Sequence, residues 1–159
     1  MDHGTAEVLG TGHGLVVGAH RNVFVLVYTG PVDEQSVRFL EAQYARFRRA
    51  GPSPYGQYVV VEEQVPLPSG AVRQEVANFM KGLAGDVVAS ALVQEGTGFR
   101  ASAVRSVAVG ISLLARQPFP HKVFATAHEA STFLAGMLEG IGPDEITSGV
   151  ATIRRLAAS

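Results

Sequence analysis

Apolar residues along the chain form two kinds of pattern: short uninterrupted runs, and longer stretches in which they recur with helical spacing. The clearest run extends from Tyr58 to Val61, where β-branched and aromatic residues follow one another without polar alternation. Such a run predicts a strand that is covered on both faces, as strands are in parallel sheets flanked by helices. Pro66 and Pro68 are expected to end it, because a proline has no amide hydrogen for the strand ladder.

A helix is predicted directly after these prolines. Ser69 precedes it as a candidate N-cap, because its hydroxyl can accept a hydrogen bond from a free amide of the first turn. We expect the helix to end at Gly82 or Gly85. Its apolar stripe consists of Val72, Val76, Phe79, Met80 and Leu83.

The same two patterns predict the other elements. We expect strands near Val8 and at 15–19, 23–28, 86–93 and 122–125, and helices at 34–49, 99–115, from Thr126 to about Gly140, and from Pro143 to Arg155. Asn22 tolerates the positive φ of a tight turn, which favours a hairpin between the strands on either side of it. Glu129 completes a capping box with Thr126. The helix at 99–115 is apolar on most faces, which predicts a central and well-covered position.

The order of these elements predicts the fold class. A hairpin followed by alternating strands and helices favours an α/β protein with a mixed sheet, in which parallel strands are joined by right-handed crossovers. We expect four to five helices around this sheet in a single domain over residues 1–140. Residues 141–159 form a helical tail that packs on this domain or on a partner. Residues 10–14 (Gly-Thr-Gly-His-Gly) lack the lysine and the helix of a phosphate loop, so a plain turn is expected there.

Composition narrows the classes of function. The chain has 159 residues, of which 47% are hydrophobic and 17% charged, as in a compact globular protein. A net charge of −1 disfavours non-specific binding to nucleic acid. The sequence contains no cysteine and starts with no basic segment of the secretory type, and its longest apolar run, about 107–115, is too short to span a bilayer. We therefore expect a cytoplasmic protein without disulfides or a membrane span.

Two short motifs resemble those of a known family. Gly30-Pro31-Val32-Asp33, after the second strand of the hairpin, resembles a Gly-x-Leu-Asp motif that starts a helix. Ser69-Gly70 resembles a Ser-Gly motif at the start of the next helix. Both motifs belong to the anti-sigma-factor antagonist (STAS) family and its SpoIIAA-like relatives, and the layout is similar over residues 15–139. Where that family places an acidic residue ahead of Ser-Gly, this chain has Pro66-Leu67-Pro68, so it is most similar to the divergent SpoIIAA-like branch.

The resemblance implies a STAS-like sheet, a regulatory role through protein–protein contact, and phosphorylation of Ser69. A phosphate there would add about −1.5 to −2 charges at a helix N-terminus, which favours anions. Two other interpretations of Ser69 remain open. It could serve only as a helix cap, or as the nucleophile of a serine hydrolase, although no Gly-x-Ser-x-Gly motif is present. Gly70 and Arg73 are the neighbouring interaction candidates, with Arg105 an alternative contact.

A second group of candidate residues follows the strand at 86–93. In a parallel sheet this loop lies at the same edge as Ser69, where open α/β folds bind ligands. Its amides, hydroxyls and guanidinium could hold an anion, although glycines at such a position also serve simply as turn residues. The group consists of Gly96, Thr97, Gly98, Arg100 and Ser102.

The remaining ionisable residues suggest no further chemistry. The histidines have no metal-ligand spacing and are expected at the surface or in turns (His3, His13, His20, His121 and His128). Glu62 and Glu63 are adjacent in a strand and therefore point to opposite faces, so they are no acid–base pair. We expect a non-catalytic regulatory protein with no cofactor or metal, a protein partner, and a composition that allows a homodimer. The alternative is a protein that binds a small anion or lipid.

Overall fold

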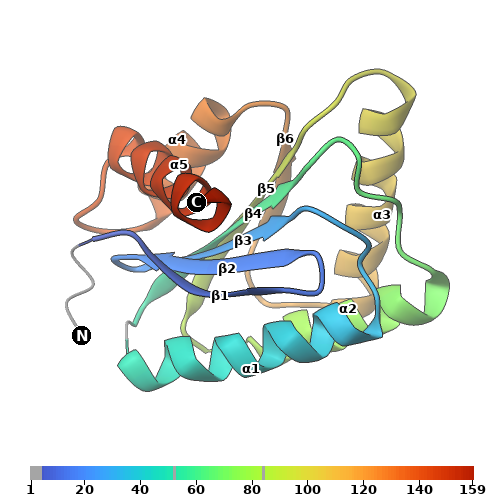
Figure 1. Ribbon diagram of the computed structural model, residues 1–159, viewed down its shortest axis with the longest axis horizontal. Helices are drawn as coiled ribbons and strands as arrows, with labels where there is room; N and C mark the ends of the chain where they lie inside the picture. Colours follow the sequence, from blue (N-terminus) through green and yellow to red (C-terminus); the bar gives the residue numbers. More distant parts are fainter. Residues whose placement is uncertain (1–4, 52, 84) are drawn as a thin grey trace.

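The structure is a computed structural model that describes residues 5–51, 53–83 and 85–159. Six strands form one sheet that is flanked by five helices (Figure 1). The strands are β1 (Glu7–Gly12), β2 (Leu15–His20), β3 (Val23–Tyr28), β4 (Tyr55–Val61), β5 (Val87–Gln94) and β6 (His121–Phe124). The helices are α1 (Glu34–Ala50), α2 (Gly70–Gly82), α3 (Phe99–Ala115), α4 (Ala127–Met137) and α5 (Pro143–Ala158).

The sheet confirms the predicted fold class. Its strands lie in sequence order from β1 to β6, with β1, β2 and β3 antiparallel and β3 to β6 parallel. Every residue of β3 is buried, as are the first six residues of β4. Burial on both faces explains why these strands have no polar alternation in the sequence.

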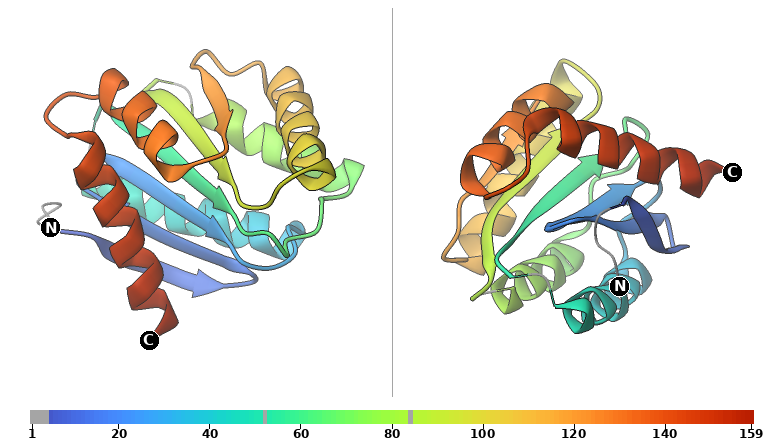
Figure 2. Two further views of the ribbon diagram at one scale, coloured as in Figure 1. Left: turned by 90° about the horizontal axis from the view of Figure 1, so that it is seen from above. Right: turned by 90° about the vertical axis from the view of Figure 1, so that its left-hand side faces the viewer.

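Helices lie on both faces of the sheet (Figure 2). An apolar layer packs each group of helices against its face. The helices α1, α2 and α3 cover one face, where the rings of Phe24, Phe47 and Tyr55 meet at centroid distances of 4.8 and 5.0 Å. The helices α4 and α5 cover the other face, and Ile146 and Ile153 of α5 are buried there. The tail helix therefore packs on the same sheet as the rest of the chain.

The helix starts follow the predicted caps. Asp33 caps α1: its Oδ1 accepts from the Ser36 amide at 2.9 Å, and the Ser36 hydroxyl accepts from the Asp33 amide at the same distance. Close packing favours glycine at position 30, because an added Cβ would lie 3.1 Å from the Gly14 Cα. At the start of α4, the Thr126 hydroxyl accepts from the Glu129 amide at 3.2 Å, so Thr126 is the cap. The Glu129 carboxylate accepts from the Thr126 hydroxyl and not from its amide, so the predicted capping box forms only in part. These short motifs thus fix where each helix begins.

Two predictions for the N-terminal segment need correction. The run 10–14 is not a plain turn, because its first three residues belong to β1 and only His13 and Gly14 turn, with φ of 54° and 71°. In the β2–β3 hairpin the residue with positive φ is Arg21, at 53°, and not Asn22. The pairing of the two strands determines which residues form each turn. The turn preference of a single residue such as Asn22 does not reveal that pairing.

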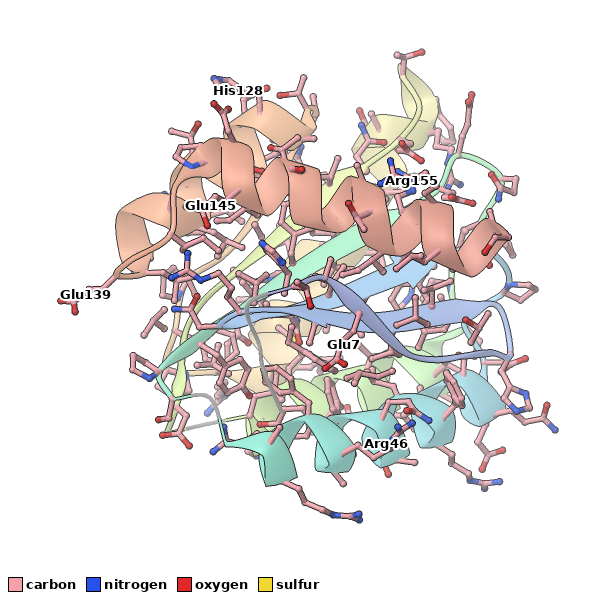
Figure 3. The ribbon with its side chains drawn as sticks, turned by 60° about the vertical axis from the view of Figure 1, so that its left-hand side comes forward. Glu7, Arg46, His128, Glu139, Glu145 and Arg155 are labelled. Atoms are coloured by element: carbon pink, nitrogen blue, oxygen red, sulfur yellow. The ribbon has the colours of Figure 1, made fainter. Side chains whose placement is uncertain are left out.

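Figure 3 shows Arg46 of α1 reaching toward β1, where its guanidinium donates to the Leu9 carbonyl at 2.5 Å.

The prediction that α3 is central and well covered is wrong. The helix lies beside α2 and β6 at one end of the molecule (Figure 1). Only Val104, Ala108 and Ala115 are buried along it, whereas Phe99 is 90% exposed and Leu113 is 71% exposed. Apolar residues on every face of a helix do not show that each face is covered, because coverage requires a neighbouring element on that side.

No helix within the described residues is long and apolar enough to cross a membrane.

Candidate functional site at the carboxyl edge of the sheet

The loops that follow β4 and β5 lie at one edge of the sheet. These strands are parallel neighbours, with Val61 of β4 beside Gln94 of β5. The first loop, residues 62–69, leads into α2, and the second, residues 95–98, leads into α3. The prediction that the two groups of candidate residues share an edge is confirmed.

Ser69 is the N-cap of α2, as predicted, and its side chain is exposed. Its hydroxyl accepts from the Val72 amide at 3.3 Å. Arg73, one turn later, donates from Nε to the Pro68 carbonyl at 3.0 Å, so its guanidinium lies close to the start of the helix. A Cβ added to Gly70 would meet nothing within 4 Å. The start of α2 is therefore an open surface with one cation held beside the serine.

The residues of the second loop do not form one site. Thr97 and Ser102 are exposed, and the amide of Ser102 is bonded within the helix to the Gly98 carbonyl. Gly96 and Gly98 have φ of 115° and 65°, which only glycine adopts readily. These two glycines are therefore turn residues.

The side chain of Arg100 runs beside Gly96 of that loop, where a Cβ added to the glycine would lie 3.5 Å from Arg100 Cδ, and its guanidinium reaches the first loop. Its Nη2 donates to the Glu62 carbonyl at 3.1 Å, which ties the start of α3 to the end of β4. Its side chain is partly buried and lines a cavity. Of the five candidate residues predicted for this loop, Arg100 is thus the one whose side chain lines the cavity.

This cavity has a volume of about 100 Å³ and lies between the sheet and the helices α2 and α3. We call it the slot. Residues 65–68 of the first loop cover it, Val76 and Phe79 of α2 and Val104 of α3 form its walls, and β3, β4 and β5 form its floor. The slot therefore lies directly beneath the loop that ends at Ser69.

Four residues with polar side chains interrupt the apolar lining of the slot: Tyr28, Gln57, Arg100 and His121. Gln57 of β4 is 1% exposed, and His121 lies at the start of β6. Gln57 Oε1, His121 Nδ1 and Arg100 Nε are buried atoms without a hydrogen-bond partner among the described residues. Gln57 Nε2 is satisfied by the hydroxyl of Ser90 on β5, at 3.1 Å.

The prediction that all histidines lie at the surface or in turns is wrong for two of them. His121 and His20 are partly buried on strands, and burial lowers the pKa of both, that of His121 to about 4. His13 and His128 are exposed, and His3 lies outside the described residues. The error arises because the sequence around a histidine in a short strand does not show which other elements pack over that strand. No group of three or more potential metal ligands gathers within the described ranges.

Two of the acids at this edge, Glu62 and Glu95, pair with α5 on the opposite face of the sheet. Arg154 of α5 donates to Glu62 at 2.6 Å and to both oxygens of Glu95 at 3.1 and 3.2 Å. The hydrogen bonds that Arg154 donates to the carboxylates of Glu95 and Glu62 raise the pKa of Arg154. Glu63 is exposed, so the two adjacent glutamates have different surroundings. This arrangement anchors α5 and leaves Arg100 without a carboxylate within 4 Å in the part of the chain that the structure describes.

Sequence reasoning missed the polar row formed by Gln57, Ser90 and His121, which lie side by side on β4, β5 and β6. The signal was present, because Gln57 and Ser90 are polar residues inside strands that are otherwise apolar. A buried polar residue is retained when it is satisfied or serves a function. No protein-family model, curated protein or solved structure matches this chain.

Proposed function

We propose that the chain is a non-catalytic regulatory protein of the STAS or SpoIIAA-like kind, which acts through protein–protein contact and is switched by phosphorylation of Ser69. The observation that carries this proposal is the position of the Ser69 hydroxyl, exposed at the first turn of α2 with Arg73 beside it. The proposal places the protein in the cytoplasm, where a serine kinase would have access to this loop.

A phosphate on Ser69 suits its surroundings. The first turn of a helix presents free amides and the positive end of the helix dipole, which stabilise an anion. The guanidinium of Arg73 can add a charge-assisted hydrogen bond. The fold should therefore tolerate the modification, while the charge of the exposed surface changes by about −1.5 to −2.

The residues around Ser69 are suited to contact another protein. Leu67 is 43% exposed, and the exposed residues Gly70 and Ala71 leave the backbone at the start of α2 accessible. A partner that packs on these residues would bury Ser69 at the interface. An added phosphate would then break the complex by desolvation and repulsion, unless the partner presents a cation.

We predict that Ser69→Asp abolishes capture of the partner that wild-type protein recovers from lysates of its own cells, whereas Ser69→Ala retains it. Asp also caps helices, so the fold should be preserved. The readout is quantitative mass spectrometry of the captured proteins, with far-UV circular dichroism to check folding.

Ser102→Asp is the matched control, because it adds the same charge at an exposed serine in the first turn of the neighbouring helix α3. We expect it to behave as wild type. Equal recovery of the same partners by wild type and Ser69→Asp would overturn the proposal, as would equal losses with Ser69→Asp and Ser102→Asp.

A further inference from the structure

We propose that the slot binds a linear, largely apolar monocarboxylic acid of medium chain length, with its carboxylate on Arg100 and its far end beside Gln57 and His121. This inference goes beyond the switch at Ser69 and does not depend on it.

The shape of the slot favours a chain over a ring system. Gln57, Val59 and Val61 all line it, and they are alternate residues of the single strand β4. At about 3.3 Å per residue the slot therefore extends roughly 13 Å along the strand. Its volume is about 100 Å³. A slender chain can lie along a space of this length, whereas a ring as wide as benzene needs a cavity of about 150 Å³.

The lining between the two ends is apolar. Leu26 of β3, Leu92 of β5, Phe79 and Met80 of α2, and Ile111 of α3 surround the middle of the slot. Such walls bind methylene groups by burial alone and give them no hydrogen-bond partner. The body of the ligand is therefore a hydrocarbon.

Arg100 supplies the charge at the outer end. It belongs to the first turn of α3, and Nη2 is bonded to the carbonyl that directly follows β4. Its Nε is buried and unpartnered, and no carboxylate pairs with it within the described residues. A guanidinium in an apolar lining needs a counter-ion, and it binds carboxylates in a planar fork. A ligand carboxylate would supply both the charge and the missing hydrogen bond.

Gln57 and His121 supply a polar end at the inner limit of the slot. Gln57 is nearly inaccessible, and its Oε1 has no donor within the described part of the chain. The nearby Ser90 hydroxyl accepts from Nε2 and so fixes the amide. A hydroxyl at the far end of the ligand would satisfy Oε1, so an ω-hydroxy acid should bind more tightly than the plain acid.

The test uses the full chain, isothermal titration calorimetry, and three probes that differ in one group each: octanoate, octanol and ω-hydroxyoctanoate. We expect octanoate to bind at one site and to raise Tm. Octanol should bind about tenfold more weakly, because it lacks the charge-assisted hydrogen bond. The ω-hydroxy acid should bind more tightly than octanoate, and Gln57→Leu should remove that gain.

Two variants separate the charge from the cavity. Arg100→Gln should weaken octanoate about tenfold and leave octanol unchanged, whereas Arg105→Gln, at an exposed arginine outside the slot, should change neither. Ala108→Leu should fill the slot from α3 and abolish binding of all three probes. Ile111→Phe serves the same purpose if Ala108→Leu fails to fold.

The proposal is overturned if octanoate does not bind the wild-type protein, or if octanol binds as tightly as octanoate. It is also overturned if a folded variant with a filled slot still binds octanoate, because the acid then adsorbs elsewhere. None of these results bears on partner capture by Ser69→Asp, so this inference and the proposed switch can fail separately.

Discussion

Replacing Ile153 with alanine is expected to lower the free energy of unfolding by about 3 kcal/mol. Ile153 is 0% exposed on the inner face of α5. A Cβ built on Gly18 would lie 2.8 Å from its Cγ2 and 2.9 Å from its Cδ1, so this side chain fills the space above a glycine of β2. The alanine leaves a cavity that a rigid strand cannot close. Urea denaturation followed by circular dichroism measures the change.

Leu156→Ala on the same helix is the control for this substitution, because Leu156 is 48% exposed. We expect it to change the free energy of unfolding by less than about 0.5 kcal/mol.

The comparison of the two substitutions also tests where the tail helix packs, because the sequence left open whether it packs on the domain or on a partner. Equal small effects of the two substitutions would mean that α5 is not part of the cooperative domain, contrary to the packing described above.

The stability of the protein is expected to fall by about 3 kcal/mol between pH 6.5 and pH 4 because of His121 alone. Burial lowers the pKa of His121 in the folded protein from 6.5 to about 4. In that range the unfolded chain takes up a proton that the folded chain does not bind, so acid favours unfolding. The contribution is complete above pH 6.5, and it is lost as the pH falls toward 4.

The measurement is the free energy of unfolding of wild type and of His121→Gln at several pH values. The variant should lack this part of the pH dependence, while carboxylates and His20 contribute equally to both proteins. His128→Gln is the control, because His128 points outward at the start of α4 (Figure 3) and should leave the pH dependence unchanged. Parallel pH profiles for wild type and His121→Gln would show that the imidazole is solvated.

The sequence predicted the architecture because local signals and tertiary packing agree in most elements. The uninterrupted run in β4 and the caps Asp33, Ser69 and Thr126 each identify an element or its first residue, and the structure places all of them as expected. Parallel order then follows from the alternation of strands and helices. The shared edge of the two loops could be predicted for the same reason.

The site itself could be predicted only in part. Ser69 was identified because a helix cap has a local sequence signature. The slot depends on how α2 and α3 pack against the sheet, and the spacing of residues in the sequence does not predict that packing. The side chain of Arg100 was expected to bind an anion at the edge of the sheet. Its orientation in the structure is set by the hydrogen bond that it donates to the Glu62 carbonyl. The pairing of Arg154 with Glu62 and Glu95 joins residues far apart in the chain. Such contacts leave no pattern in one sequence.

The most direct test of the proposed function is the phosphate content of Ser69 in two pools of the protein from its own cells. Partner-bound and free protein are separated, and the fraction of Ser69 phosphorylated in each is measured by mass spectrometry of the peptide that contains it. The proposal predicts that phosphate on Ser69 is concentrated in the free pool, because its charge breaks the complex. The same fraction in both pools, or no phosphate in either, would contradict it.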